Sequence, residues 1–279
     1  MTDNRRYAEV IGDPISHSKS PMIHNFWLAK AGISAEYKAA HVRADAVADY
    51  LAQRKADHCW LGCNVTMPHK EQVLAAVDHI DEQARSIGAS NCLMINADRK
   101  LIATNTDVDG VSAALNSRKL SSGKVCIIGA GGAARAAFFT LAQIPGIEAH
   151  VLARNPEKAR NVTRLAGLAA ECVPLHPESG VLAGASLLIN ATQLGMTGQP
   201  DMPDFILNEV AAMEPDALIF DMVYQPLETQ LLYTARASGR KTADGLTMLI
   251  GQAATAYEKF FGMPAPRQHD AALRALLLR

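Results

Sequence analysis

The amino-acid sequence predicts an α/β protein. Strand and helix patterns alternate almost throughout its 279 residues, which favours a parallel or mixed sheet covered by helices on both faces. A polar stretch over residues 115–123 interrupts this alternation, and a glycine-rich turn at residues 129–134 opens a second α/β series. The length suits one large or two modest domains, since domains commonly contain about 100–200 residues.

The first half of the chain begins with a strand, and helix and strand patterns then alternate. The predicted strands are Tyr7–Gly12, Glu36–Val42 and Trp60–Thr66, and the predicted helices are Pro21–Ala31, Ala44–Arg54 and one that opens at Pro68. Ser20 is a candidate N-cap for the first helix, with Pro21 at its first helical position and Gly32 as its stop. Ser90–Asn96 and Lys100–Ala103 form a predicted short strand pair, with Asp98 in the turn.

The second half repeats the alternation after the polar stretch. The predicted strands are Val125–Ile128, Ala149–Leu152, Leu187–Asn190 and Ala217–Met222, and the predicted helices are Ala133–Leu141, Pro156–Leu168, Leu246–Phe261 and Asp270–Leu278. The run Val125–Ile128 is rich in β-branched residues, as a buried parallel strand would be. The last two helices could belong to either domain.

Composition excludes several classes of protein. With 49% hydrophobic residues the chain can build a packed core, and 27 basic against 28 acidic residues give a net charge of −1, hence no general attraction to nucleic acid or to an anionic membrane. No apolar run approaches the roughly 18 residues of a membrane span, and the N-terminus has no apolar signal core. The five scattered cysteines and nine histidines lack metal-ligand spacing, so we expect no metal and reduced thiols in a cytoplasmic protein.

The glycine turn Gly129–Ala134 follows a predicted strand and opens a predicted helix. This G-x-G-x-x-A arrangement is typical of dinucleotide-binding turns. Small residues are needed because phosphate must approach backbone N–H groups at the positive end of a helix, and a side chain at Gly131 would block that approach. A tight turn without a ligand is the alternative interpretation.

The end of the next strand favours NADP over NAD. Enzymes that use NAD usually place an acidic residue there, against the ribose 2′-hydroxyl. Here the strand ends in Leu152-Ala153-Arg154-Asn155, so Arg154 can pair with a 2′-phosphate, and Asn155 can cap the next helix and contact the same phosphate. A solvated surface arginine is the alternative for Arg154.

Two polar segments of the first half are candidates for substrate binding and catalysis. The hydroxyl-rich loop from Ser16 to Pro21 could hydrogen-bond a small polyhydroxy acid, or could simply cap a helix. Asn64 and Thr66 share one face of a strand, because alternate residues align. Lys70 is expected in the first helical turn, where the helix field would lower its pKa and suit acid/base chemistry; a surface lysine is the alternative.

Thr104-Asn105-Thr106-Asp107 lies just before the second series of strands and helices. Asp107 could cap a helix, or it could pair with Lys70 and hold it in place. The residues alone leave these two interpretations equal.

Taken together, these segments resemble the shikimate dehydrogenase family over nearly the whole chain. The matching motifs, in order, are GDPISHSKSPMIHN, GCNVTMPHK, GASN, NTD, IGAGGAARA, INAT..GM, DMVYQP and DGLTMLIGQAA. The resemblance implies two α/β domains with a cleft between them. These are a mixed-sheet substrate and catalytic domain over 1–108 and 245–279, and a Rossmann-type NADP-binding domain over 109–244.

The resemblance also implies a role for individual residues. Lys70 and Asp107 match the catalytic lysine and its paired aspartate. The implied substrate contacts are Ser18, Ser20, Asn64, Thr66, Asn91, Asn105, Tyr224 and Gln252. The implied cofactor contacts are Gly129, Ala130, Gly131, Gly132, Ala133, Arg154, Asn155, Asn190, Thr192, Met222, Gly245 and Met248. The serine pair and Tyr224 would hold the substrate carboxylate, and the two asparagines at 91 and 105 its ring hydroxyls.

The implied activity is the reversible, NADP-linked oxidation of shikimate to 3-dehydroshikimate, a step of aromatic amino acid biosynthesis, in a monomer or homodimer. The chain departs from the family pattern at Ser90-Asn91-Cys92, Val108-Asp109, Ala153-Arg154-Asn155 and Gln193-Leu194. A quinate or quinate/shikimate dehydrogenase is therefore an alternative, although a serine at position 20 favours shikimate. A non-catalytic NADP-binding sensor would not need Lys70 and Asp107 together.

Overall fold

The computed structural model describes residues 5–116, 118, 120–176 and 180–278. It divides into two compact units, Met1–Thr106 with Gln252–Arg279 (unit 1), and Asp107–Gly251 (unit 2). The sequence placed the second boundary at 244/245. No loop marks the division there, because one helix, α9 (Gly245–Phe261), begins in unit 2 and ends in unit 1.

Unit 1 contains a mixed sheet with the strand order β2-β1-β3-β5-β6-β4 in the described residues. Its strands are β1 (Arg6–Gly12), β2 (Ala35–His41), β3 (Trp60–Val65), β4 (His79–Ile80), β5 (Cys92–Ile95) and β6 (Leu101–Thr104). Only β5 runs antiparallel to its neighbours, so β5 and β6 form the short hairpin that the sequence predicted. The parallel strands β1, β3 and β6 therefore end at one edge of the sheet, where β5 begins.

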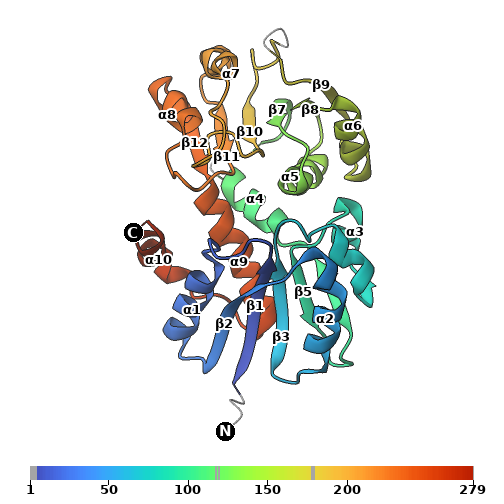
Figure 1. Ribbon diagram of the computed structural model, residues 1–279. Helices are drawn as coiled ribbons and strands as arrows, with labels where there is room; N and C mark the ends of the chain where they lie inside the picture. Colours follow the sequence, from blue (N-terminus) through green and yellow to red (C-terminus); the bar gives the residue numbers. More distant parts are fainter. Residues whose placement is uncertain (1–4, 117, 119, 177–179, 279) are drawn as a thin grey trace. The chain divides into compact units, whose positions relative to one another are not determined.

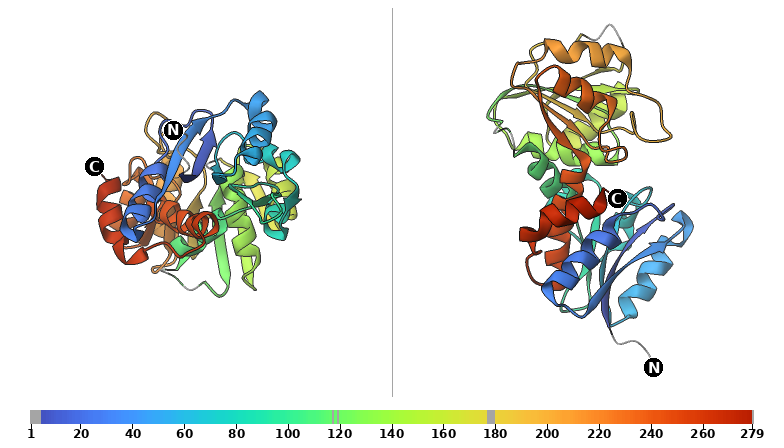
Figure 2. Two further views of the ribbon diagram at one scale, coloured as in Figure 1. Left: turned by 90° about the horizontal axis from the view of Figure 1, so that it is seen from below. Right: turned by 90° about the vertical axis from the view of Figure 1, so that its left-hand side faces the viewer.

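Helices cover both faces of this sheet (Figure 1). They are α1 (Ser20–Ala31), α2 (Val47–Ala56), α3 (Glu82–Ile87), the second part of α9, and α10 (Asp270–Leu277). Side chains of β1 alternate between the faces: Tyr7 and Ile11 pack with Leu51 of α2, whereas Ala8 and Val10 pack with Phe260 of α9. Helices α1 and α10 lie side by side, as both views in Figure 2 show.

Helix α1 begins one residue earlier than the sequence predicted. Ser20 is its first residue and Lys19 its N-cap, and no side chain accepts a capping hydrogen bond. The predicted role of Ser20 as the cap is therefore wrong. The stop at Gly32 is confirmed, because Gly32 adopts a left-handed conformation with φ 66° that favours glycine.

Unit 2 contains an all-parallel sheet with the strand order β12-β11-β10-β7-β8-β9 in the described residues. Its strands are β7 (Gly123–Ile128), β8 (Ile147–Ala153), β9 (Ala170–Pro174), β10 (Leu187–Asn190), β11 (Leu218–Asp221) and β12 (Lys241–Asp244). Read from the unit's first strand, this is the order 3-2-1-4-5-6 of doubly wound sheets. The order reverses between β7 and β10, so their carboxyl ends mark the switch point at which such sheets bind ligands.

The helices of unit 2 are α4 (Asp107–Leu115), α5 (Gly132–Ala142), α6 (Pro156–Leu165), α7 (Asp204–Glu209), α8 (Gln230–Ala237) and the start of α9. Alternate residues of the buried strands face opposite layers. Ile127 packs in the cluster that includes α4, α5 and α6, whereas Ile128 packs with residues of α7 and α8. Both faces of this sheet are therefore covered, and the predicted α/β class with two sheets is confirmed.

Among the described residues, no helix is both long enough and apolar enough to cross a membrane.

Candidate functional site

The sheet topology of unit 1 gathers most of the predicted substrate residues at one edge. Ser18 and Ser20 follow β1, while Asn64 and Thr66 lie at the end of β3. Asn91 directly precedes β5 and Asn105 directly follows β6. Because the parallel strands end at the edge where β5 begins, segments far apart in the sequence meet there.

A network of amide groups connects four of these segments. The side-chain oxygen of Asn91 accepts from the backbone N–H of Thr106 at 2.7 Å, and its Nδ2 donates to Thr106 Oγ1 at 3.1 Å and to Gln252 Oε1 at 3.4 Å. The backbone carbonyl of Asn91 accepts from Asn64 Nδ2 at 3.1 Å. All four side chains are buried, so the network holds each amide in a defined orientation.

Thr106 belongs to this network although sequence reasoning gave it no role. It is the middle residue of the NTD motif, and only 1% of its surface is exposed. Its hydroxyl also lies 3.4 Å from Gln252 Oε1. The signal was present in the motif, but only the fold shows that this hydroxyl lies between Asn91 and Gln252.

Thr66, at the end of β3, packs against the end of β1, and a glycine in β1 makes this close approach possible. Its backbone N–H donates to the carbonyl of Ile11 at 2.9 Å. A Cβ atom on Gly12 would lie 2.5 Å from Thr66 Cγ2 and 3.1 Å from the carbonyl oxygen of Met67. Gly12 therefore lets the loop after β3 pack against the end of β1.

Lys70 does not lie in the first turn of a helix, so that prediction is wrong. Residues 67–71 form turns, and only a short 3₁₀ helix, Gln72–Ala76, follows. The loop is anchored by the buried ring of His69, whose Nε2 lies 2.6 Å from the carbonyl of Val42. Lys70 therefore does not lie in the positive field at the N-terminus of an α-helix, as the sequence had predicted. Its backbone carbonyl accepts from the N–H of Ser90 at 2.8 Å, which holds Lys70 beside the Asn91 network.

The serine loop places a lysine between its two predicted carboxylate contacts. Ser18 Oγ accepts from the backbone N–H of Ser20 at 3.3 Å. Lys19 between them points elsewhere, because its Nζ donates to the carbonyl of Leu277 in the last turn of α10 at 2.6 Å. This contact ties the loop to the last turn of α10.

Asn105 and Asp107 bracket Thr106 at the start of α4. Asn105 Nδ2 donates to the carbonyl of Ala89 at 2.8 Å, which links the GASN and NTD motifs. Asp107 is the first residue of α4 and is 5% exposed. Since it follows Thr106 directly, the backbone holds it close to the amide network.

Two of the three glycines in the glycine turn of unit 2 have different requirements. Gly129 has φ 103°, and a Cβ there would lie 2.6 Å from Thr192 Cγ2, so the fold itself needs glycine. Gly131 has an extended backbone, φ −86° and ψ −170°, and a Cβ there would meet nothing within 4 Å. Neither backbone nor packing requires glycine at 131, so open space remains above the N-terminus of α5, as a bound phosphate would need. The residues present therefore fit a dinucleotide.

The end of β8 carries the predicted specificity residues. Arg154 is exposed. Asn155 is the N-cap of α6, as the sequence predicted, and its side chain accepts from the N–H of Lys158 at 3.0 Å. The cap fixes the backbone next to Arg154, while the guanidinium stays at the surface.

A buried network fixes the loops after β10 and β11. Asn190 Nδ2 donates to Asp221 Oδ1 at 2.9 Å, and its own Oδ1 accepts from Thr192 Oγ1 at 2.6 Å. Thr229 Oγ1 donates to Asp221 Oδ2 at 2.6 Å. Burial raises the pKa of the Asp221 carboxyl to about 6, although three hydrogen bonds oppose this shift. Asn190 and Thr192 thus lie at the switch point, where the sequence predicted cofactor contacts.

The remaining predicted residues of unit 2 lie on or near the same edge. Met222 follows β11, and a Cβ on Gly245 would collide with its carbonyl group. Met248 packs in the hydrophobic cluster with Val111 and is only 8% exposed. Tyr224 lies in the loop after β11, where burial raises the pKa of its hydroxyl. Its predicted contact with the substrate carboxylate stays a prediction.

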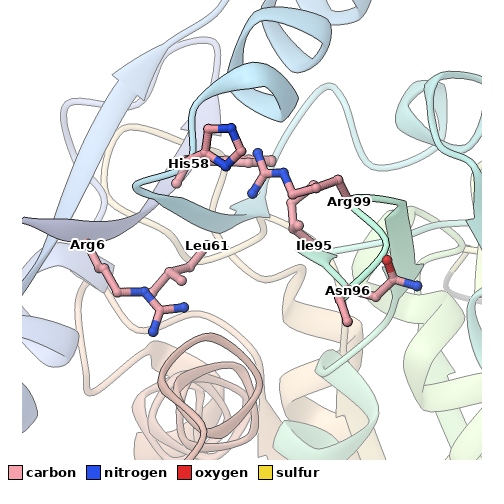
Figure 3. A pocket seen from close by; sticks show the side chains of 8 residues that line it. Arg6, His58, Leu61, Ile95, Asn96 and Arg99 are labelled. Atoms are coloured by element: carbon pink, nitrogen blue, oxygen red, sulfur yellow. The ribbon is translucent and has the colours of Figure 1, made fainter. Parts of the chain in front are cut away.

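A cavity of about 230 Å³ lies at the opposite end of the unit 1 sheet (Figure 3). It is lined by Arg6, His58, Trp60, Leu61, Ile95, Asn96, Ala97 and Arg99. These residues come from the starts of β1 and β3 and from the β5–β6 turn, and none is a predicted site residue. The candidate site is therefore at the other edge, where the strands carry their carboxyl ends.

Two departures from the family pattern, Ser90-Asn91-Cys92 and Gln193-Leu194, contain residues that pack in the interior of the fold. Ser90 is fully buried, and its hydroxyl donates to the backbone carbonyl of Thr104 at 2.7 Å. Cys92 packs in the hydrophobic core beside Phe260. Leu194 packs against the core of unit 2, and its carbonyl accepts from Asn190 Nδ2 at 3.1 Å. None of these three residues replaces a predicted contact.

Comparisons with known proteins agree along the whole chain. Residues 10–93 match the model of the shikimate dehydrogenase substrate binding domain, and residues 245–272 match that of the shikimate 5'-dehydrogenase C-terminal domain. A relative from Sphingopyxis alaskensis, named shikimate dehydrogenase (NADP(+)), is 46% identical over 98% of this chain and 97% of its own length. A relative of the same name from Rhodospirillum rubrum is 41% identical over 100% and 99%.

Solved structures show the same two-domain fold. Shikimate dehydrogenase from Thermus thermophilus, in complex with NADP(H) and shikimate, matches with a TM-score of 0.82 and 32% identity over 97% of this chain and 99% of its own. The 5-ketofructose reductase of a Gluconobacter strain matches with a TM-score of 0.87 and 30% identity over 98% and 99%.

Proposed function

Because this chain belongs to the shikimate dehydrogenase family, we propose that it catalyses the reversible, NADP-dependent oxidation of the 3-hydroxyl of shikimate to 3-dehydroshikimate. The observation that carries the proposal is the convergence of Asn64, Asn91, Thr106 and Gln252 in one buried polar network, beside the backbone of Lys70. Such a network can orient a small ring that bears several hydroxyls.

In this proposal unit 1 supplies most of the substrate contacts. The hydroxyls of Ser18 and Ser20 hold the carboxylate, and Tyr224 assists them. Asn91 and Asn105 bind ring hydroxyls, with Asn64, Thr66 and Gln252 as neighbouring contacts. Because hydride transfer requires a near-attack geometry, these contacts contribute by fixing the reacting carbon.

Lys70 and Asp107 move the proton. During oxidation the O–H bond at C3 breaks, and its proton passes to the Lys70–Asp107 pair as the carbonyl forms; in reduction the pair returns it. NADP, when bound, accepts the hydride that leaves C3 or supplies it in the reverse direction. The overall change converts shikimate and NADP⁺ to 3-dehydroshikimate, NADPH and one proton.

Unit 2 holds the cofactor in a Rossmann-type domain. The backbone N–H groups at the start of α5 bind the pyrophosphate, with Gly129–Ala133 forming the turn. Arg154 pairs with the 2′-phosphate, and Asn155 contacts the same group. The edge formed by Asn190, Thr192, Met222, Gly245 and Met248 lines the rest of the pocket. We further propose that the protein is cytoplasmic and that it is a monomer or a homodimer. Light scattering measures the oligomeric state directly.

The test is an assay at 340 nm wavelength with NADP⁺ and NAD⁺ against shikimate and quinate, and with NADPH and NADH against 5-ketofructose. The proposal expects the highest kcat/KM for shikimate with NADP⁺. A higher kcat/KM for quinate would assign the chain to the quinate-using branch. Turnover of 5-ketofructose but of neither acid would overturn the carboxylate role of the serine pair. Tight NADP binding without turnover of any compound would indicate a sensor.

A further inference from the structure

Helix α1 contacts both the backbone and the ring of Tyr37 in β2. Asn25 Nδ2 donates to the backbone carbonyl of Tyr37 at 2.8 Å, and Asn25 Oδ1 accepts from its N–H at 2.9 Å. The ring of His24 stacks on the Tyr37 ring, with centroids 4.0 Å apart and planes 4° from parallel. Tyr37 is 1% exposed, so these contacts lie in the protein interior.

His24 serves here as a stacking partner for the Tyr37 ring rather than as an acid or base. It is fully buried, and within the described part of the chain neither ring nitrogen has a hydrogen-bond partner. Burial lowers the pKa of His24 to about 3, so the ring is neutral at physiological pH. Its neighbours Trp27, Tyr257 and Phe260 complete an aromatic cluster around it. The His-Asn pair that ends the first motif therefore serves to fix Tyr37.

The hydroxyl of Tyr37 donates to Oδ1 of Asn64 at 2.6 Å. Burial raises the pKa of this hydroxyl well above its usual value, so it keeps its proton and donates. On the other side, Asn64 Nδ2 donates to the carbonyl of Asn91. A reversed amide would direct its oxygen at that carbonyl, two acceptors facing each other. The two bonds together fix which end of the Asn64 amide points where.

We propose that Tyr37 is a positioning residue for substrate binding, which acts by holding the Asn64 amide in a single orientation. The inference rests on the proposed function, because it assumes that Asn64 contacts the substrate. Asn64 Nδ2 carries two hydrogens, of which one binds the Asn91 carbonyl and the second is presented to the ligand. Helix α1 thus contributes twice: Ser20 at its first residue contacts the substrate, and His24 and Asn25 one turn later support Tyr37.

The experiment is a double-mutant cycle with Tyr37→Phe and Asn64→Ala, measured with shikimate and NADP⁺. Tyr37→Phe keeps the stacked ring and removes only the hydroxyl. It should lower kcat/KM for shikimate by about 5- to 10-fold, mostly through KM, as the loss of one buried hydrogen bond predicts. The KM for NADP⁺ should stay within about twofold. In the Asn64→Ala background, Tyr37→Phe should have no further effect, because the group it orients is gone.

Tyr7→Phe is the matched control. Tyr7 lies in the same sheet, and its hydroxyl donates to Asp57 Oδ2 at 2.7 Å, near the opposite end of the strands. This variant should keep wild-type KM for shikimate. Additive losses in the cycle, or equal effects of Tyr7→Phe and Tyr37→Phe, would show a purely structural role and overturn the inference. If Tyr37→Phe gave no folded protein by circular dichroism, the same cycle with Asn25→Ala would test it. An inactive wild-type protein would instead refute the proposed function.

Discussion

The polar edge of unit 1 and the glycine turn of unit 2 are built in opposite ways. In unit 1, side chains from β3, from the residues just before β5 and just after β6, and from α9 bind one another in a buried network. In unit 2, one strand–turn–helix segment offers backbone N–H groups, with open space at Gly131 and an exposed Arg154. A substitution in the network should therefore disturb several neighbours, whereas one in the turn should act locally.

The largest effect is expected at Lys70 of unit 1, the proposed catalytic lysine. Lys70→Ala should lower kcat by about 10²–10⁴-fold, the usual contribution of a positioned acid or base, and change shikimate binding less. Steady-state kinetics with shikimate measures this. Lys100→Ala, in the β5–β6 turn at the other end of the sheet, is the matched control and should keep wild-type kcat. A Lys70→Ala enzyme with near-native turnover would remove Lys70 from the mechanism.

The buried carboxyl of Asp221 tests whether unit 2 also depends on a side-chain network. Its pKa in the folded protein is about 6, above the ordinary 3.8, so folding favours the protonated form. The unfolding free energy should therefore decrease as pH rises from about 4 to 6, by about 3 kcal/mol from this group. Asp221→Asn keeps the shape and lacks this decrease. Urea unfolding of both proteins at pH 4 and pH 7 compares them, and parallel pH profiles would contradict the assignment.

Substitutions of Gly131 and Gly129 distinguish a requirement for ligand binding from a requirement for folding. Gly131→Ala should raise the KM for NADP⁺ on the order of 10- to 100-fold, since lost hydrogen bonds to a charged phosphate cost about 1.5–3 kcal/mol. Its unfolding free energy should fall by less than about 1 kcal/mol, because the new Cβ meets no protein atom.

Gly129→Ala is the contrasting variant. Its positive φ and the contact with Thr192 should lower the unfolding free energy by about 1–3 kcal/mol. Thermal unfolding and NADP⁺ titration of both variants give the comparison. Equal destabilisation of the two would mean that Gly131 is needed for folding rather than for the cofactor.

The smallest effect is expected at the surface arginine. Arg154→Ala should raise the KM for NADP⁺ by about tenfold, the equivalent of one charge-assisted hydrogen bond, and leave the KM for NAD⁺ nearly unchanged. Initial rates with each cofactor at saturating shikimate measure this. Equal losses for both cofactors would refute the contact with the 2′-phosphate.

How far the sequence predicted each site follows from this difference in construction. The turn at 129–134 and the cap at Asn155 depend on residues next to one another, so their local pattern was sufficient. The helix expected at Pro68 was wrong because the segment is held by His69 contacting Val42, a residue 27 positions away. Likewise the roles of Thr106 and Tyr37 were not predicted, since their partners Asn91 and Asn64 belong to other segments.

The sequence by itself determined the α/β class, the motif residues and the chemistry that they can perform, because hydrophobic periodicity and side-chain type are properties of the chain. Only the tertiary structure decided which end of each amide points where. It also directed the side chain of Lys19 to the carbonyl of Leu277 in α10. Orientation depends on hydrogen-bond partners, and in this protein those partners come from strands and helices that the sheet topology alone brings together.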